Sequence, residues 1–345
     1  MIERVLKAYG LQGAKLEYFG NGLINQTWAA VAPQGHFILQ KVNDDVFKRP
    51  LDIASNTRLI ADHLKQYQPG YFFVAPILSA DGNDMIFFEG EGYFRAFPFV
   101  ENSHSTDIVK TPEQAYEAAS QFGKFTHLLS GFNADELTIT IPDFHNLELR
   151  YNQFLDALKE GNPERLSHSK KQVEQLMHHV DIVDEYISIL SQTAFKRRVT
   201  HHDTKISNVL FDKNEKAICI IDLDTVMPGY FFSDVGDMMR TYLSPASEEE
   251  KEYDKIVVRD DFYKAIVQGY SAQMKNELTA IESKYFFYAA RFMIYMQALR
   301  FLTDYLNDDV YYGAKYKDHN FVRATNQLVL LQRLIEKKRE LGVLS

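Results

Sequence analysis

The chain has 345 residues, 46% of them hydrophobic and 25% charged, and its 47 acidic and 38 basic residues give a net charge of −9. This composition is typical of a folded globular protein and excludes a disordered or fibrous one. The acidic balance argues against nucleic acid or an anionic membrane as a partner. The single cysteine, Cys219, permits no intramolecular disulfide and no cysteine-based zinc site.

The N-terminus carries charges at Glu3, Arg4 and Lys7, where a signal peptide would be apolar. No apolar run approaches the roughly 18 residues of a membrane span. We therefore expect a cytoplasmic protein.

The first hundred residues contain short β-type runs separated by turn signals, at 28–31, 37–42, 85–88 and 93–100. One helical pattern interrupts them at 52–67. It places four side chains on one face, Ile53, Ile60, Leu64 and Tyr67, and Asp52 is a candidate cap.

After a polar segment at 101–106 the patterns become helical, at 113–129, 147–159, 173–190, 262–274, 283–307 and 321–340. A β island at 198–200, 209–211 and 216–221 breaks them, and the charged run 248–252 is expected to be a solvated helix start. In 173–190 helical spacing relates Val173, Met177, Val180, Val183, Ile187 and Leu190. We predict an α+β protein with a β-rich lobe at 1–101, a helical lobe at 102–345 and a ligand cleft between them.

The segment 199–211 is polar in its middle and flanked by strands. A loop there would project Asp203, with Asn208 five residues later at the start of a strand. The returning strand would bring Asp222 beside Asn208. Carboxylate and amide oxygens are ligands that suit Mg²⁺, and a carboxylate that does not bind the metal can accept a proton from a hydroxyl group.

The pattern His201-x-Asp203-x-Lys205-x-x-Asn208, followed by Asp222, resembles the catalytic loop and metal-binding aspartate of protein-kinase-like enzymes. Without a Phe-Gly after the aspartate, it resembles the aminoglycoside phosphotransferase family of small-molecule kinases. Within that family, the stretches 22–27, 39–43, 199–209 and 221–229 are most similar to N-acetylhexosamine 1-kinases. The resemblance spans about residues 18–315 and implies a bilobal protein-kinase-like fold that uses ATP and Mg²⁺.

Carried over residue by residue, the resemblance makes Asp203 the catalytic base and places Lys205 near the transferred phosphoryl group. It makes Asn208 and Asp222 the Mg²⁺ ligands. Asp224 would either help to bind the metal or order the loop.

Neighbouring residues are expected to support this loop. His201 resembles the histidine that braces it, and His202 is expected to be a solvent-facing neighbour. The segment 234–237 is expected to tether the loops, with Asp237 buried and hydrogen-bonded rather than a ligand.

For the nucleotide, the resemblance points to a phosphate loop with Gly22, Asn25 and Thr27, and to a hinge with Phe99 and Glu101 that meets adenine.

Kinases carry a lysine on the third strand and a helix glutamate that pairs with it. When the strand 37–41 is aligned by Leu39, Gln40 stands at the lysine position, and Asn56 is the nearest candidate for the glutamate position. We expect these two amides to form a pair. Lys41 should face the opposite side of the strand.

For an acceptor sugar, the resemblance points to Arg300 and to one of Tyr311 and Tyr312. A guanidinium fork suits vicinal hydroxyls. An alternative is a surface arginine paired with Asp304. Phe144, His145 and Arg150 are candidate rims of the same pocket.

The leading hypothesis is an ATP- and Mg²⁺-dependent kinase that forms the 1-phosphate of an N-acetylhexosamine (GlcNAc or GalNAc). A second hypothesis keeps the fold but changes the acceptor to an amino alcohol, homoserine, another sugar or an aminoglycoside. A third is a non-catalytic kinase-like binding module, which the replaced lysine and glutamate would favour. The oligomeric state stays open.

Overall fold

The computed structural model describes residues 2–20 and 24–342. The chain forms two compact units, each built from several segments. The sheet unit comprises 1–104, 128–142 and 210–228, and the helical unit comprises 105–127, 143–209 and 229–345. The α+β prediction of an N-terminal sheet and a larger helical part is confirmed. A functional division of the chain at residues 101/102 stays a prediction.

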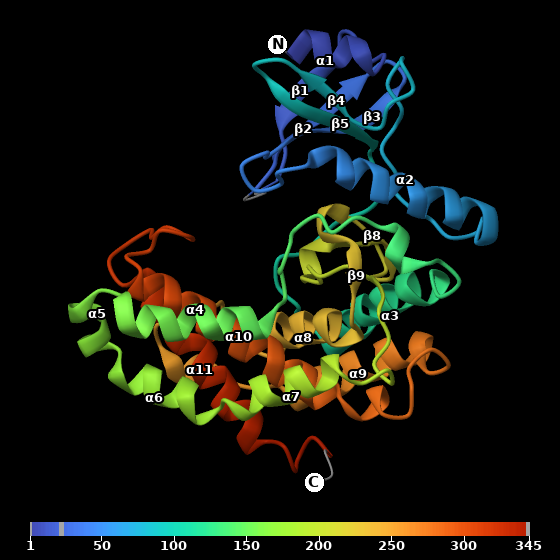
Figure 1. The fold of residues 1–345 in the computed structure, drawn as a ribbon. Helices are drawn as coiled ribbons and strands as arrows, with labels where there is room; N and C mark the ends of the chain where they lie inside the picture. The colour runs from blue at the N-terminus through green and yellow to red at the C-terminus, as the bar shows by residue number, and fades with distance from the viewer. Residues whose placement is uncertain (1, 21–23, 343–345) are drawn as a thin grey trace. The chain divides into compact units, whose positions relative to one another are not determined.

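The sheet unit contains a five-stranded antiparallel sheet with the order β1-β2-β3-β5-β4 (Figure 1). Each neighbouring pair along this order is antiparallel. The strands are β1 (Lys15–Tyr18), β2 (Gln26–Ala32), β3 (Gly35–Val42), β4 (Ile86–Phe88) and β5 (Gly92–Pro98).

The two faces of this sheet carry different helices. Helix α1 (Ile2–Ala8) shares a buried cluster with Leu39 and Ala96, and the opposite face places Val42 against Ile53 of helix α2 (Pro50–Tyr67). Since side chains alternate along a strand, Lys41 shares the α1 face and Gln40 the α2 face.

Helix α2 begins differently from the sequence expectation. Arg49 occupies the N-cap position and Pro50 the first turn, where a missing N–H costs nothing. Asp52 therefore lies inside the helix and forms an ion pair with Arg49 at 2.9 Å, so its predicted capping role is wrong. Tyr67, at the helix end, is 60% exposed.

The rest of the sheet unit includes the hairpin of β7 (Val209–Phe211) and β8 (Ala217–Ile220), then the 3₁₀ turn η3 (Leu223–Thr225). A further 3₁₀ turn is η1 (Ala134–Glu136), and β9 (Met227–Gly229) follows η3. Cys219 is buried in β8, and burial raises the pKa of its thiol to about 12, as expected of a core residue.

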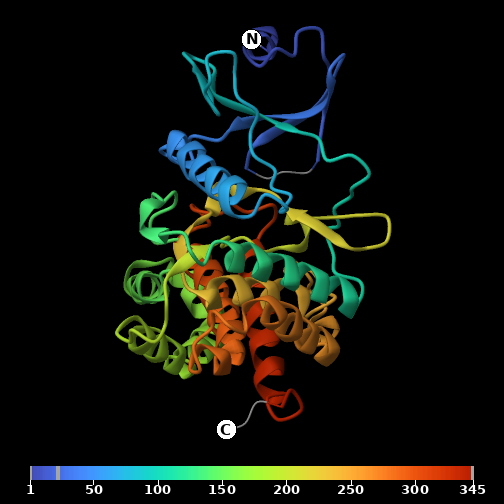
Figure 2. The same cartoon turned by 90° about the vertical axis from the view of Figure 1, so that its right-hand side faces the viewer.

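Helix α10 (Phe286–Leu306) lies in the middle of the helical unit and contacts α4, α7, α8 and α11 (Figures 1 and 2). It is apolar on almost every side, as befits a helix surrounded by others. The remaining elements are α3 (Pro112–Leu128), α4 (Leu147–Glu160), α5 (Pro163–His168), α6 (Lys170–His178), α7 (Asp181–Leu190), β6 (Arg198–Thr200), η2 (Ile206–Asn208), α8 (Phe231–Tyr242), η4 (Tyr253–Lys255), α9 (Asp260–Met274), η5 (Glu282–Lys284) and α11 (His319–Glu336).

The single helix predicted for 173–190 is wrong, because the chain breaks between α6 and α7 after His178. The buried face of α7 follows Ile182, Tyr186 and Ile189, whereas Ile187 is 43% exposed. In α6 the buried side chains are Gln172 and Leu176, while Met177 and Leu190 of the predicted face are 41% and 42% exposed. The predicted apolar face therefore differs from the buried face in both helices.

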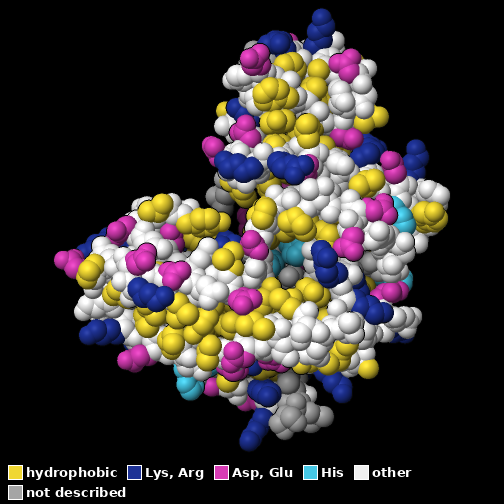
Figure 3. All heavy atoms as spheres, in the orientation of Figure 1, with side chains coloured by type: hydrophobic (Ala, Val, Ile, Leu, Met, Phe, Trp, Pro, Cys, Tyr) yellow, Lys and Arg dark blue, Asp and Glu magenta, His cyan; other side chains and the backbone are white. Residues whose placement is uncertain are grey.

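Of the described residues, no helix is long and apolar enough to cross a membrane. On the face drawn in Figure 3, lysine and arginine side chains are interspersed with aspartate and glutamate.

Gly236 allows α8 and α10 to approach closely, and we expect Gly236→Ala to destabilise the protein by about 1–3 kcal/mol. A Cβ there would press on the carbonyl oxygen of Ala289 and lie 2.9 Å from Cβ of Met293. Urea unfolding monitored by circular dichroism measures the change.

The matched control is Gly131→Ala, where a Cβ meets no atom within 4 Å. It should change stability by less than about 0.5 kcal/mol. Equal stability of the two variants would contradict the close packing of α8 on α10.

Candidate active site

Asp203, Lys205 and Asn208 converge in the loop that follows β6. Oδ2 of Asp203 accepts hydrogen bonds from Nζ of Lys205 at 2.8 Å and from Nδ2 of Asn208 at 3.1 Å. Nδ2 of Asn208 also donates to the backbone carbonyl of Asp203 at 2.8 Å. The short turn η2 returns the chain and brings Asn208 back to Asp203. The structure thus brings together three residues that the sequence singled out.

The charge state of Asp203 follows from these contacts. Burial raises the pKa of its carboxyl, but the charge and hydrogen bond of Lys205, with smaller help from His201 and Asn208, outweigh burial and lower the pKa below its usual value. An ionised carboxylate at neutral pH can accept a proton. Because the amide nitrogen of Asn208 makes both bonds to Asp203, its amide oxygen points away and is a hard donor that fits Mg²⁺.

Helix α8 holds this loop through buried carboxylates. Asp234 accepts the backbone N–H groups of His201 at 3.0 Å and His202 at 2.7 Å, and Asp237 accepts that of Thr204 at 2.9 Å. Burial raises the pKa of Asp234 to about 7, and the two backbone hydrogen bonds oppose this rise. The expected tethering role of 234–237 is confirmed at the level of these contacts.

The two histidines of the loop are both buried. His201 is fully enclosed and packs edge-on against Phe122 at 5.1 Å, in keeping with a bracing role. The expectation of a solvent-facing His202 is wrong, since this side chain is 5% exposed. Its φ of 67° turns the ring inward, where Nε2 lies 2.8 Å from Oγ1 of Thr200 and Nδ1 lies 3.3 Å from Nδ1 of His145.

Asp222 follows strand β8 in the sheet unit. It has a left-handed backbone, with φ of 62° and ψ of 63°, directly before the turn η3, and its side chain is exposed. A residue other than glycine keeps this conformation only where its surroundings enforce it, which is common at functional sites. An exposed carboxylate on a fixed turn fits a magnesium ligand.

Asp224, two residues later, is 2% exposed and lies against Arg95 of β5. Oδ1 of Asp224 is 2.5 Å from Nη1 of Arg95, and Oδ2 accepts a hydrogen bond from Nδ2 of Asn25 at 2.8 Å. Arg95 donates in turn to Oε1 of Gln40 from Nε at 3.0 Å and from Nη2 at 2.8 Å. Gln40 donates to Oγ1 of Thr27 at 3.2 Å.

The predicted amide pair of Gln40 and Asn56 is wrong. Asn56 is 1% exposed and exchanges hydrogen bonds with the backbone of Thr138, at 2.8 and 2.9 Å, and donates to the carbonyl of Val226 at 3.2 Å. Backbone groups therefore satisfy this amide, and the partner of Gln40 is the arginine directly across the strand pair.

Of the other residues predicted for the nucleotide, Thr27 lies in β2 and Gly22 lies outside the described residues. Phe99 and Glu101 follow the end of β5, where the N–H of Phe99 donates to the carbonyl of His36 at 3.0 Å and the carboxylate of Glu101 lies 2.8 Å from Nδ1 of His36.

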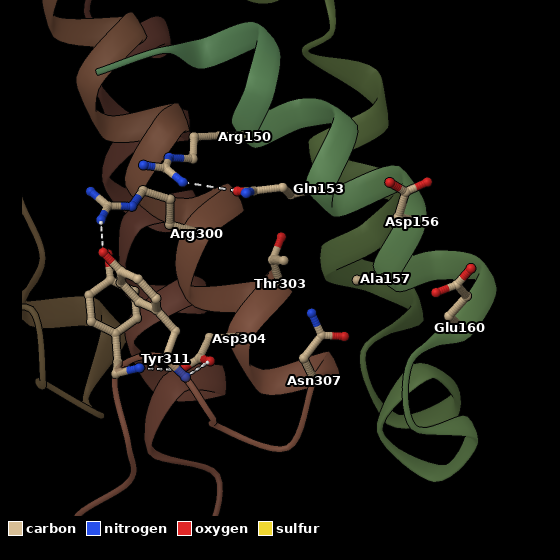
Figure 4. Close-up of a pocket in the computed structure, with 11 residues that line it drawn as sticks. Arg150, Gln153, Asp156, Ala157, Glu160, Arg300, Thr303, Asp304, Asn307 and Tyr311 are labelled. Atoms are coloured by element: carbon tan, nitrogen blue, oxygen red, sulfur yellow. Dashed lines mark hydrogen bonds between the residues drawn. The ribbon is translucent and has the colours of Figure 1, made fainter. Parts of the chain in front are cut away.

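A pocket of about 330 Å³ opens in the helical unit. Figure 4 shows Arg150 and Arg300 on one side of the residues drawn and Asp156 and Glu160 on the other. Arg300, Tyr311 and Tyr312, the predicted sugar contacts, all line it. The full lining is Arg150, Gln153, Asp156, Ala157, Glu160, Arg300, Thr303, Asp304, Asn307, Tyr311 and Tyr312.

Arg300 is a pocket residue rather than a surface partner of Asp304. Nη2 of Arg300 lies 3.4 Å from the hydroxyl of Tyr311, and the guanidinium carbon is 5.4 Å from the ring centre of Tyr312. Asp304 instead accepts the backbone N–H groups of Tyr311 at 2.7 Å and Tyr312 at 2.9 Å. The carboxylate thus shapes the loop that carries both tyrosines.

The arginines bond to neutral acceptors. Arg150 donates to Oε1 of Gln153 and to the carbonyl of Asp143, both at 3.0 Å, and burial, then Arg300, lowers the pKa of Arg150. Burial, then His202 and Arg300, holds the pKa of His145 well below its usual value. The site can therefore offer several donors to an oxygen-rich ligand.

Sequence reasoning missed a buried chain of ion pairs beside this pocket. Arg240 donates to Asp237 at 3.0 Å and to Glu248 at 3.0 Å, and Nη2 of Arg323 donates to Glu248 at 2.5 Å. Residues 248–252 are not a helix, so the predicted solvated helix start is wrong. Burial raises the pKa of Glu248, but the charges and hydrogen bonds of Arg240 and Arg323 outweigh burial and lower this pKa below its usual value.

Sequence reasoning also missed Arg95 and helix α8. The signal for Arg95 was an arginine inside the apolar run 93–100. The signal for α8 was an arginine three residues after Asp237, at helical spacing.

The five-stranded sheet and the helical part match solved structures over nearly their full lengths. The structure of the microcompartment-associated aminopropanol kinase matches with a TM-score of 0.66 at 15% identity, covering 99% of this chain and 98% of that one. An aminoglycoside phosphotransferase from Alicyclobacillus acidocaldarius matches with a TM-score of 0.65 at 12% identity, covering 98% and 96%. The amicoumacin kinase hAmiN, in complex with AMP-PNP, Ca²⁺ and Ami, matches with a TM-score of 0.66 at 13% identity, covering 96% and 92%.

These likenesses establish the protein-kinase-like fold. The sequence itself matches the family described as "Phosphotransferase enzyme family" over residues 15–276. Because this match covers well over half of the chain, the chain belongs to the phosphotransferase enzyme family.

Proposed function

We propose that this protein transfers the γ-phosphoryl group of ATP, with Mg²⁺, to the anomeric hydroxyl of an N-acetylhexosamine. The observation that carries the proposal is the geometry of Asp203, whose carboxylate is held ionised by Lys205 and Asn208. The sequence resemblance supplies the acceptor class. The likeness to an AMP-PNP complex of a kinase supports a nucleotide with a divalent cation.

In this mechanism Asp203 orients the acceptor hydroxyl and takes its proton as the oxygen attacks phosphorus. Lys205 would meet the transferred phosphoryl group, and Asn208 and Asp222 are the residues proposed to hold Mg²⁺. The cation supplies charge neutralisation for the phosphates. Gly22, Asn25 and Thr27 are proposed for the phosphates, and Phe99 and Glu101 for the adenine.

Most of the rate enhancement should come from positioning and electrostatics, since phosphoryl transfer asks little covalent chemistry of the protein. The described residues hold no group of three or more His, Cys, Asp or Glu side chains placed for a metal ion. Magnesium in kinase sites is usually held by one or two carboxylates together with substrate phosphates.

The acceptor is proposed to bind in the pocket beside Arg300 and Tyr312. Its donors, Arg150 and Arg300, suit ring hydroxyls and an acetamido carbonyl. Of the predicted rims, Arg150 lines this pocket, whereas Phe144 and His145 do not.

A second candidate is an acceptor that carries an amine, such as an amino alcohol or an aminoglycoside. Asp156 and Glu160 line the same pocket and could receive an ammonium group. The aminopropanol kinase likeness is in keeping with this class. A panel of hexosamines, amino alcohols and aminoglycosides in an ADP-release assay separates the two. A non-catalytic module would turn over ATP with none of them.

We expect the product to be the 1-phosphate of N-acetylglucosamine or N-acetylgalactosamine. A ³¹P–¹H correlation spectrum should show phosphorus coupled to the anomeric proton. Coupling to the C6 protons, or phosphorylation of an amine-bearing acceptor alone, would reject the sugar 1-kinase assignment.

Asp203→Asn should lower kcat by about 10²–10⁴-fold, the usual loss for a general base, because an amide cannot take the proton. Nucleotide affinity, measured by calorimetry with Mg·ADP, should stay close to wild type. Asp254→Asn, at a fully exposed aspartate, is the matched control and should keep full activity. A near wild-type kcat for Asp203→Asn would exclude it as the base.

Lys205→Met should shift the acid limb of the pH–kcat profile to higher pH. Lys205 lowers the pKa of Asp203 and burial raises it, so removing the lysine leaves the opposing effect of burial. The base then becomes protonated, and activity is lost, at a higher pH than in the wild type. An acid limb that does not move would show that Lys205 does not control this carboxylate.

A further inference from the structure

Arg95 is a buried cation that the sequence patterns did not single out. It lies on β5, directly opposite Gln40 of β3, and is 3% exposed. Its guanidinium spans two partners, Gln40 on one side and Asp224 on the other. A buried charge is costly unless it is paired and hydrogen-bonded, and both conditions are met here.

Kinases of this general fold use a β3 lysine, held by a helix glutamate, beside the nucleotide phosphates. In this chain β3 offers Gln40 on the face toward α2, and Lys41 lies on the other face. Across the strand pair from Gln40 stands Arg95. On this face of the sheet, the positive charge therefore lies on β5, whereas other kinases carry it on β3.

We infer that Arg95 is a positioning residue of the nucleotide site, which holds the turn that carries Asp222 in place of the usual lysine–glutamate pair. The inference rests on the proposed function only in that the protein binds Mg·ATP. Arg95 acts through Asp224, which lies two residues after Asp222 in the turn η3.

The surroundings of the turn show how Arg95 would act. Asn25 binds the second oxygen of Asp224, and Oγ1 of Thr140 donates to the Asp224 carbonyl at 2.8 Å. Asn56 of α2 holds the carbonyl of Val226 at 3.2 Å. Thr140 and Asn56 thus hold two backbone carbonyls after Asp222, and Asn25 holds the Asp224 side chain. The left-handed conformation of Asp222 needs such enforcement.

A guanidinium suits this task better than an ammonium group. Its planar fork donates to Gln40 and Asp224 at once in fixed directions, whereas lysine offers a compact charge on a flexible stem. Gln40 has a matching role, since Oε1 accepts from Arg95 while Nε2 donates to Thr27 of β2. This side-chain bridge links three strands to the turn.

A purely structural ion pair is the competing explanation, and one variant separates the two. Removing a single partner leaves the other charge buried and unpaired, which can unfold the unit. The double variant Arg95→Gln/Asp224→Asn removes both charges and keeps hydrogen-bonding side chains. Its thermal stability without nucleotide should stay near that of the wild type.

The test is calorimetric binding of ADP to the full chain, with and without Mg²⁺. For the double variant and for Arg95→Lys we expect the affinity for Mg·ADP to fall by about 10-fold or more, the usual effect of losing an orienting partner behind a metal ligand. Binding of metal-free ADP should change little, because adenine and ribose contacts remain. The Mg²⁺ concentration needed for half-maximal ATP turnover should rise in parallel, with the acceptor KM unchanged.

Lys41→Ala is the matched control. Lys41 follows Gln40 on β3 and lies on the opposite face of the sheet, so this variant should bind Mg·ADP as the wild type does. A folded double variant with wild-type Mg·ADP affinity would overturn the inference and leave Arg95 a structural residue. A crippling Lys41→Ala would also overturn it, by making Lys41 the phosphate cation. If the wild-type protein itself bound no Mg·ADP, the proposed function would fail instead.

Discussion

The loop that carries Asp203 depends on two buried carboxylates of α8, those of Asp234 and Asp237. Asp234 and Asp237 accept hydrogen bonds from three backbone N–H groups of this loop, those of His201, His202 and Thr204, at 2.7 to 3.0 Å. A loop of this shape would otherwise leave those donors buried without partners, at a cost of about 1–3 kcal/mol each. The same bonds fix the direction in which Asp203 leaves the loop. The position of Asp203 therefore depends on helix α8.

Charge balance extends this constraint across the helical unit. Asp237 and Glu248 are joined by Arg240, and Glu248 is joined to Arg323. Arg323 donates to Oδ1 of Asn320 at 3.1 Å, and Asn320 donates to Asp304, which holds the backbone of Tyr311 and Tyr312. An unbroken polar path thus runs from the tether of the catalytic loop to the wall of the pocket. Because each member is buried or half-buried, a change at one link leaves a charge or donor unpaired at the next.

Sequence patterns predicted the parts of this protein that follow local rules. The sheet strands alternate, most helices keep their spacing, and the Asp203–Asn208 motif lies within six residues of chain that one short turn brings together. The failures involve buried polar partners that are distant in sequence. Asn56 was matched with Gln40, yet the backbone near Thr138 and Val226 satisfies it. His202 looked exposed because a polar residue in a polar loop gives no sign that its ring turns inward. Glu248 looked solvated because its arginines come from α8 and α11.

The pocket has charges of both signs, and this bears on which acceptor the enzyme would select. Arg150 and Arg300 make hydrogen bonds to neutral groups, whereas Asp156 and Glu160 line the pocket as acids. A site whose buried donors need acceptors rejects a ligand that cannot supply them far more strongly than it rejects one of slightly different size. The arginines thus favour an acceptor rich in oxygen around the reacting hydroxyl, whether or not it also carries an amine. A small amino alcohol has too few oxygens to satisfy both guanidinium groups. For the proposed acceptor, a sugar ring would supply oxygens to both guanidinium groups, and an amine on that ring would meet the acidic side chains Asp156 and Glu160.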